Sequence, residues 1–260
     1  MLNIIKEILR QLRRDLLLWA FGAYFAIIML VLALSGEFDL DACGSLAYGA
    51  YVGDSLTLIL PIAAGIITSR GCGCDLRDKT ANYEVLFGKR RYEVYFGRFF
   101  ASLIFVFILT AVITLLPILF LTVKNGWGGS LAADKALTIF GMLFPILFRA
   151  VCFYTALSFL ASHDIVPMII ALIGSGLLMV SAAIMAEMDY PLTWHTAVTD
   201  LMRLLDFSNT GSSFFKGRDI TVYKVDLPVK LIVRMLLTSF GIGSAWLFGG
   251  YAIFRKRDIS

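Results

Sequence analysis

Long apolar runs separated by short polar segments dominate the chain. A helix that crosses about 30 Å of hydrocarbon needs roughly 17–25 residues. Six runs reach this length, at residues 16–34, 51–68, 99–123, 136–160, 165–186 and 231–254. The pattern therefore predicts an all-α integral membrane protein with six transmembrane helices, which form a single transmembrane domain over residues 1–260.

The basic residues predict the orientation of these spans. They gather ahead of the first run, in residues 69–98 between the second and third runs, and in the tail at 255–257. With six spans, all three segments lie on one side, and the positive-inside rule makes that side the cytoplasm. The connection between the fifth and sixth runs also carries basic residues, but several aspartates dilute its charge. Both termini are therefore expected in the cytoplasm.

Composition agrees with a membrane location. Hydrophobic residues make up 59% of the chain and charged residues only 16%, which is more apolar than a soluble core of this size requires. The net charge of +4 is small, and its clustering is accounted for by topology. We expect lipid as the surrounding medium and no nucleic acid as a partner.

The outer connection between the fifth and sixth runs contains a further periodic segment. Its apolar residues recur at helical spacing, with Asp200 and Arg203 on other faces; they are Leu192, Val198, Leu201, Leu204 and Leu205. A short amphipathic helix at the outer membrane surface and a small folded loop cap both account for this pattern.

The residues needed for catalysis are not evident in the sequence. It contains no Gly-x4-Gly-Lys-Ser/Thr phosphate-binding loop. His163 and His195 lie in connections that face opposite sides of the membrane in this topology. We therefore expect no catalytic residues and no cofactor in this chain, and any ATP that drives it would be bound by another subunit.

The cytoplasmic connection between the second and third runs has the most informative spacing. Asp75 is followed five residues later by Thr80, and Arg91 is followed seven residues later by Arg98. This pattern resembles the permease subunits of type-2 ABC exporters, in which an acidic residue ends the second span and Thr, Arg and a second basic residue follow at these spacings. The family's usual Gly before Thr is Lys79 here, and its usual Pro ahead of the Arg is missing. The basic tail at 254–259, the six spans and the long fifth connection are also similar to that family.

The resemblance implies a role for the chain and a set of partners. It implies the permease subunit of an ATP-driven exporter in the bacterial plasma membrane, with two permease chains, identical or different, and two ATP-binding subunits that hold ATP and Mg²⁺. A cytoplasmic coupling helix between spans 2 and 3, with Asp75, Thr80, Arg91 and Arg98, would receive the motion of the ATPase. Systems of this layout often expel antimicrobial peptides or drugs, which implies a role in immunity to such compounds.

Two alternatives remain open. The charge of residues 69–98 also fits an ordinary positive-inside loop, although Tyr83–Phe96 mixes aromatic, apolar and charged residues as a surface helix would. A secondary transporter or channel is the alternative function, and it predicts inverted repeats and several polar residues at mid-membrane depth.

Cys72 and Cys74 could share a soft metal ion, but no further ligands lie near them in the sequence. Reduced cytosolic thiols are the better interpretation. We assign no metal.

Arg149 is the one charge deep within a predicted span. Such charges usually face a bundle interior or an aqueous cavity. Asp54 lies at a different depth and is excluded as its partner, which leaves the partner unassigned. Pro117 and Pro145 each remove a backbone donor from a span, and Pro145 lies one turn from Arg149. These three residues are the candidates for a translocation pathway.

Gly241, Ala245 and Gly249 recur every four residues along the last span. Small residues at this spacing let helices approach closely. We interpret them as a packing face within the bundle, in preference to a dimer contact.

Overall fold

The computed structural model describes most of the chain. The described residues are 1–15, 43–45, 48, 56–73, 80–161, 165–187, 196–205, 208–215, 218–224 and 227–256. The predicted first span, residues 16–34, lies outside them, as do the start of the predicted second span and Asp75.

The described part is mainly helical and carries one β-hairpin. Its elements in chain order are α1 (Leu2–Arg14), α4 (Leu56–Thr68), η2 (Ser69–Gly73), α6 (Thr80–Leu86), α7 (Arg91–Asn125), α8 (Ala133–Ala161), α9 (Ile165–Ile169), η3 (Ile170–Gly174), α10 (Ser175–Glu187), α11 (Ala197–Leu204), β1 (Ser208–Phe215), β2 (Arg218–Lys224) and α12 (Val229–Lys256). The segments η2 and η3 are π-helical.

Three helices, α7, α8 and α12, are long and apolar enough to cross a membrane, by their length and composition. The chain is therefore read as a multi-pass membrane protein, which confirms the coarser part of the prediction. Two shorter apolar helical stretches, Ile59–Gly73 and Ile165–Ser181, fall within or next to the predicted second and fifth spans. Six spans remain a prediction.

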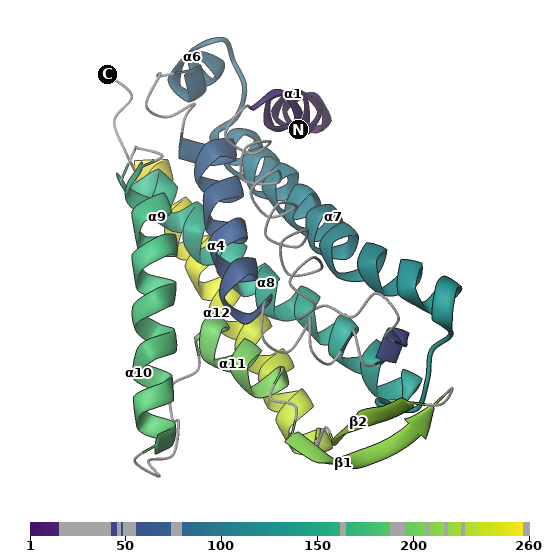
Figure 1. Ribbon diagram of the computed structural model, residues 1–260. Coiled ribbons are helices and arrows are strands. Elements are labelled where there is room, and N and C mark those ends of the chain that lie inside the picture. The colour runs from purple at the N-terminus through teal and green to yellow at the C-terminus, as the bar shows by residue number, and fades with distance from the viewer. Residues whose placement is uncertain are drawn as a thin grey trace.

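The long helices form a bundle with distinct ends (Figure 1). Helices α1 and α6 lie at one end, where α12 also finishes, and the hairpin lies at the other end. Helix α7 leads from the α1 end towards the hairpin end, and α8 leads back. The described parts of the N-terminal segment, of the 69–98 connection and of the tail therefore lie at the same end of the bundle. That this end is cytoplasmic stays a prediction.

Close packing between α8 and α12 holds the centre of the bundle together. A Cβ atom at Gly250 would lie 2.6 Å from the Tyr95 hydroxyl and 2.8 Å from Ala156. One at Gly243 would lie 3.0 Å from the Phe148 ring. Glycine is needed at Gly250 because any side chain there would overlap its neighbours.

The predicted packing face of the last span is wrong. Gly241, Ala245 and Gly249 are exposed, and nothing lies within 4 Å of a Cβ built on either glycine. The face that packs carries Gly243, Leu247 and Gly250 instead. The spacing rule selected one line of small residues on this helix, but the contacts with α8 use another face, which spacing alone did not identify.

The N-terminal helix α1 is amphipathic and lies against the start of α7 (Figure 1). Its apolar face, Ile4, Ile8 and Leu12, is buried. The face packs on glycine positions, because a Cβ at Gly97 would lie 3.0 Å from Ile4 and one at Gly71 would lie 3.7 Å from Ile8. The sequence predicted a basic N-terminal segment but not this docking.

The hairpin is an addition to the helical architecture that the hydropathy pattern did not predict. Strands β1 and β2 are antiparallel, with Ser213 opposite Ile220 and Gly211 opposite Val222. Strand β2 alternates Ile220 and Val222 with Thr221 and Tyr223, all residue types that favour strands. A search for spanning helices by hydropathy does not detect this segment, because it is short and polar.

Candidate functional site

Arg149 forms a buried ion pair with Asp200. The Arg149 Nη2 to Asp200 Oδ2 distance is 2.7 Å, and the two side chains are only 4% and 2% exposed. Arg149 lies sixteen residues along α8, or about 24 Å from its first residue at 1.5 Å per residue. The pair therefore lies near the middle of a helix that is long enough to cross a membrane, and the unassigned partner of Arg149 is Asp200.

Local sequence holds Asp200 in place. Thr196 caps α11, since its hydroxyl accepts a hydrogen bond from the Thr199 backbone N–H at 3.2 Å while the Thr196 N–H donates to the Thr199 hydroxyl at 3.0 Å. Asp200 falls in the first turn of α11, where the helix dipole favours a negative charge. Arg203, one turn further on, lies 3.5 Å from the second Asp200 oxygen.

The predicted outer-surface helix at residues 192–205 is corrected by this geometry. Helix α11 covers part of that range, but it packs against α4, α8 and α10. Asp200, which was expected on an outward face, is 1% exposed and faces Arg149. The hydrophobic period located the helix, and its apolar residues Val198, Leu201 and Leu204 are buried, but the period did not indicate that Asp200 is buried as well.

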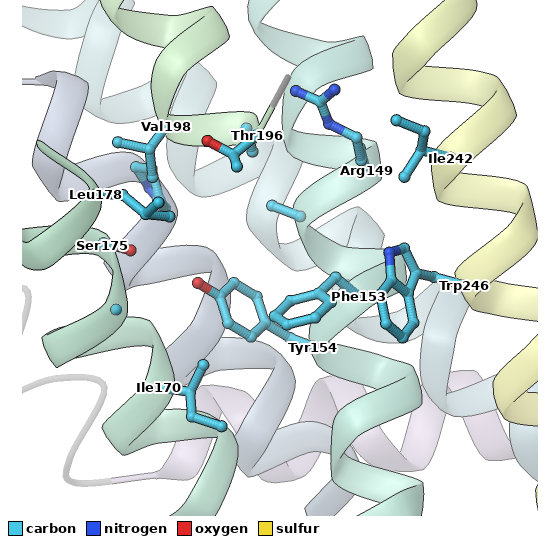
Figure 2. Close-up of a pocket in the computed structure, with 14 residues that line it drawn as sticks. Arg149, Phe153, Tyr154, Ile170, Ser175, Leu178, Thr196, Val198, Ile242 and Trp246 are labelled. Carbon is cyan, nitrogen blue, oxygen red and sulfur yellow. The ribbon is translucent and has the colours of Figure 1, made fainter. Parts of the chain in front are cut away.

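A cavity of about 300 Å³ lies beside the ion pair (Figure 2). Six helical segments, α4, α8, η3, α10, α11 and α12, contribute to its wall. The lining residues are Pro61, Arg149, Ala150, Phe153, Tyr154, Ile170, Gly174, Ser175, Leu178, Thr196, Ala197, Val198, Ile242 and Trp246. Its surface is mainly apolar and aromatic, and Arg149, Thr196, Ser175 and Tyr154 bring polar groups to it.

Tight packing shapes one wall of the cavity. A Cβ at Gly65 of α4 would lie 2.1 Å from the Ala171 Cβ and 3.2 Å from the Tyr154 ring, so a side chain cannot fit there. The π-helical segment η3 supplies Ile170 and Gly174 to the cavity. Short π-helical insertions are frequent at functional sites because they re-aim side chains within a helix.

The predicted prolines occupy two different helices. Pro145 lies in α8, half-buried and one turn before Arg149, and it cannot donate a hydrogen bond to the Gly141 carbonyl. Pro117 lies within α7, and its side chain is outside the described part. Sequence reasoning found Arg149 and missed its ion-pair partner Asp200 and the cavity residues Tyr154 and Trp246. The capping sequence that begins at Thr196 was the one signal that could have singled out Asp200.

Three of the predicted coupling residues, Thr80, Arg91 and Arg98, lie at the α1 end of the bundle. Arg98 is 1% exposed, and its Nη1 donates to the Glu84 Oε2 at 2.8 Å. Lys89 Nζ donates to the other Glu84 oxygen at 3.0 Å. The Arg91 guanidinium donates to the carbonyls of Phe254 and Arg255 at the end of α12. Arg98 therefore ties α6 to α7, and Arg91 ties α7 to α12.

Glu84 is held in its charged form. Burial alone would raise the pKa of Glu84, but Arg98 and Lys89 outweigh this effect and hold the pKa below the ordinary 4.5. The link between α6 and α7 is therefore an ion pair at neutral pH.

The predicted surface helix over residues 83–96 is wrong as a single element. Helix α6 ends at Leu86, a turn follows in which Gly88 has a φ of 89°, and α7 begins at Arg91. Glycine suits this turn because a positive φ strains other residues. Thr80 is the first residue of α6, and Asp75 lies outside the described residues.

Three large apolar side chains are exposed at this end of the molecule. Tyr83, Leu86 and Phe87 are 56%, 69% and 86% exposed, and Lys89 and Arg90 follow them. We call Tyr83, Leu86 and Phe87 the α6 patch. An exposed apolar patch beside charged residues is typical of a site for a partner or a membrane surface.

Cys72 is buried and its sulfur lies 3.8 Å from the Ser102 hydroxyl. Cys74 is outside the described part. Within that part, no three His, Cys, Asp or Glu side chains gather as a metal site would require.

Comparison with known proteins gives no relative for this chain. No protein-family model matches it, and no curated protein or solved structure shows significant similarity. Functional inference therefore depends on the residues and their geometry.

Proposed function

We propose that the chain is the permease subunit of an ATP-driven ABC exporter. In this account its helices form the translocation pathway, and a separate ATP-binding subunit hydrolyses ATP with Mg²⁺. The observation that carries the proposal is the α6 patch. Tyr83 and Leu86 of this short helix and Phe87 in the turn after it are exposed, and the Glu84–Arg98 ion pair fixes the helix to the bundle. Such a helix suits a groove on a soluble partner.

A continuous route of contacts supports coupling between α6 and the cavity. Glu84 and Arg98 join α6 to α7, and Arg91 joins α7 to the end of α12. Helix α12 packs closely on α8, where a Cβ at Gly243 would lie 3.3 Å from the Arg149 Cα. A push on α6 would therefore reach the helix that carries Arg149. Arg98 acts in this scheme as a positioning residue.

Six spans with cytoplasmic termini form part of the proposal. The segments α9, η3 and α10 follow one another without a break from Ile165 to Glu187. At 1.5 Å per residue this rod is about 34 Å long, which is enough to cross the hydrocarbon. Helix α4 and the η2 segment would form part of the second span, and residues 16–34 would form the first span. Both termini, α1 and α6 would then lie on the cytoplasmic side.

A second permease chain is the proposed membrane partner. The exposed face of α12 with Gly241, Ala245 and Gly249 supports this, because small residues four apart let another helix approach closely. The two chains could be identical or different. The bacterial plasma membrane as location, and an antimicrobial peptide or drug as substrate, follow from the family resemblance.

The α6 patch provides the test. The protein with Leu86→Ser and Phe87→Ser would be purified from membranes of its native host in mild detergent. We expect the unaltered protein to co-purify with an ATP-binding-cassette subunit and the altered protein to lose most of it. Val123→Ser is the matched control, because Val123 is also 86% exposed but lies near the far end of α7. Retention of the ATP-binding subunit by the altered protein would contradict the docking assignment.

If no ATP-binding subunit accompanies even the unaltered protein, the proposal itself fails. A secondary transporter or channel would then be the better account.

A further inference from the structure

The cavity beside Arg149 opens towards the membrane. Three of its lining residues are partly exposed on the outside of the bundle: Ile170 by 37%, Ile242 by 38% and Trp246 by 42%. They belong to η3 and α12, so the opening lies between those two elements. Because η3 and α12 are apolar helices that would lie in lipid, the opening faces hydrocarbon, and molecules would enter from the bilayer.

The two ends of the cavity differ in polarity (Figure 2). Arg149 and Thr196 lie at the end next to α11, beside the apolar side chains of Val198 and Ile242, while Phe153, Trp246 and Ile170 lie towards the other end. The Tyr154 hydroxyl lies between them and is paired with Ser175. A ligand that matched this surface would have a polar head at the α11 end and an apolar chain at the other.

The volume limits the size of the ligand. About 300 Å³ equals the liquid volume of roughly ten water molecules. A methylene group is of similar size to a water molecule, so about ten carbons of one hydrocarbon chain fit, and two chains do not. The rest of a longer chain would extend through the opening into the bilayer. The volume is at the lower end of the range for small-molecule sites.

Arg149 determines the charge of the head group. Its guanidinium group offers five N–H donors in a planar fork, which suits carboxylate and phosphate oxygens. It reaches the cavity while it also bonds Asp200. The Thr196 hydroxyl beside it is a further hydrogen-bonding group. An acidic head at this place would receive charge-assisted hydrogen bonds from the Arg149 guanidinium.

We propose that this cavity is a binding site for a single-chain acidic amphiphile, whose chain enters from the bilayer and whose head lies beside Arg149 and Thr196. The proposal goes beyond the permease function, because it needs only that these helices lie in a membrane. It holds whether or not an ATPase binds to α6.

Trp246 supplies the reporter for a test. The protein has four tryptophans, and a variant with Trp19, Trp127 and Trp194 changed to Phe leaves Trp246 alone. This variant would be placed in liposomes and titrated with dibromostearic acid, whose bromine atoms quench tryptophan fluorescence. We expect quenching that saturates at a low ratio of acid to lipid and that unbrominated stearic acid reverses by competition.

Matched glycine substitutions separate the cavity from the surrounding lipid. Gly174 lines the cavity, whereas nothing lies within 4 Å of a Cβ at Gly176 two residues later. Gly174→Leu should fill the space and raise the half-saturating ratio by about tenfold or more, while Gly176→Leu should leave it unchanged. If Gly174→Leu does not give monodisperse protein, Ala197→Phe fills the same cavity from α11.

The head group has its own control. Dibromostearate methyl ester keeps the chain but lacks the charge. The ratio of ester to lipid that gives half-maximal quenching should therefore be about tenfold higher than the ratio for the acid. Equal behaviour of the acid and the ester would overturn the role of Arg149.

Two other results would overturn the site. One is quenching that rises in proportion to the amount of probe and is equal in all variants, because this result reflects only the partition of the probe into the bilayer. The other is equal, saturable quenching by a brominated phosphatidylcholine, which would make the occupant an ordinary membrane lipid.

Discussion

The Arg149–Asp200 pair gives the sharpest prediction of stability. Asp200→Asn keeps the size of the side chain but removes the charge that faces Arg149 at 2.7 Å. A guanidinium group would then remain buried without its carboxylate. Removal of one partner from a buried ion pair typically costs about 3–5 kcal/mol, because the remaining charge stays desolvated.

This cost converts into a measurable change in melting temperature. For a protein of this size, 1 kcal/mol shifts the unfolding midpoint by about 2–4 °C, so Asp200→Asn should lower it by roughly 6–20 °C. The assay is thermal unfolding of purified protein in detergent, followed by circular dichroism and gel filtration.

Arg203→Gln is the matched control on the same helix. Arg203 lies 3.5 Å from Asp200 and is 22% exposed, and partly exposed pairs contribute about 0–1 kcal/mol. The unfolding midpoint of the Arg203→Gln variant should therefore fall by no more than about 4 °C. The double variant Arg149→Met with Asp200→Leu should recover most of the lost stability, because two apolar side chains leave no buried charge without a partner.

Additive effects would refute this reasoning. If Arg149→Met and Asp200→Leu each lower the midpoint and the double variant lowers it by their sum, the two side chains do not interact and α11 is not held by this pair.

Four further outcomes are expected. Gly250→Ala should destabilise the protein by about 1–3 kcal/mol in thermal unfolding because its Cβ meets Tyr95 and Ala156, whereas Gly249→Ala should be near neutral; equal effects would contradict the packing of α12 on α8. The Glu84–Arg98 ion pair should hold α6 against α7 above pH 4.5, and it should break as the pH falls through the lowered pKa of Glu84. Hydrogen exchange of the α6 amides should therefore accelerate only in acid. In the Glu84→Gln variant the same amides should exchange fast already at neutral pH. Single cysteines at position 89 should be labelled only from the cytoplasm and those at 127 and 214 only from outside; external labelling at 89 would reverse the topology. Gly241→Leu should weaken self-association in native mass measurements and Gly176→Leu should not; no difference between the two would remove the α12 face as a contact.

Hydropathy located the long helices well. The predicted third, fourth and sixth spans fall within α7, α8 and α12, because a long apolar run has few alternatives to a buried or lipid-facing helix. The ends were less accurate, since α7 begins at Arg91, several residues before its predicted span. Amphipathic ends of long helices carry charges, and a hydropathy threshold omits them.

Tertiary contacts decided what the sequence could not. Nothing in the pattern around Asp200 tells whether α11 lies on a surface or folds against α8, because its apolar period is the same in both cases. Gly241 and Gly250 likewise look equivalent in sequence, although one is exposed and the other meets Ala156. Arg149 was found because a charge within an apolar run is rare whatever its partner.

The composition of the purified complex tests the central claim most directly. The protein would be extracted from native membranes in mild detergent, and its mass and subunits determined by native mass spectrometry, with ATP hydrolysis measured on the same sample. The account predicts two permease chains with two ATP-binding subunits and ATP turnover in the presence of Mg²⁺. A complex that contains only permease chains and hydrolyses no ATP would contradict it.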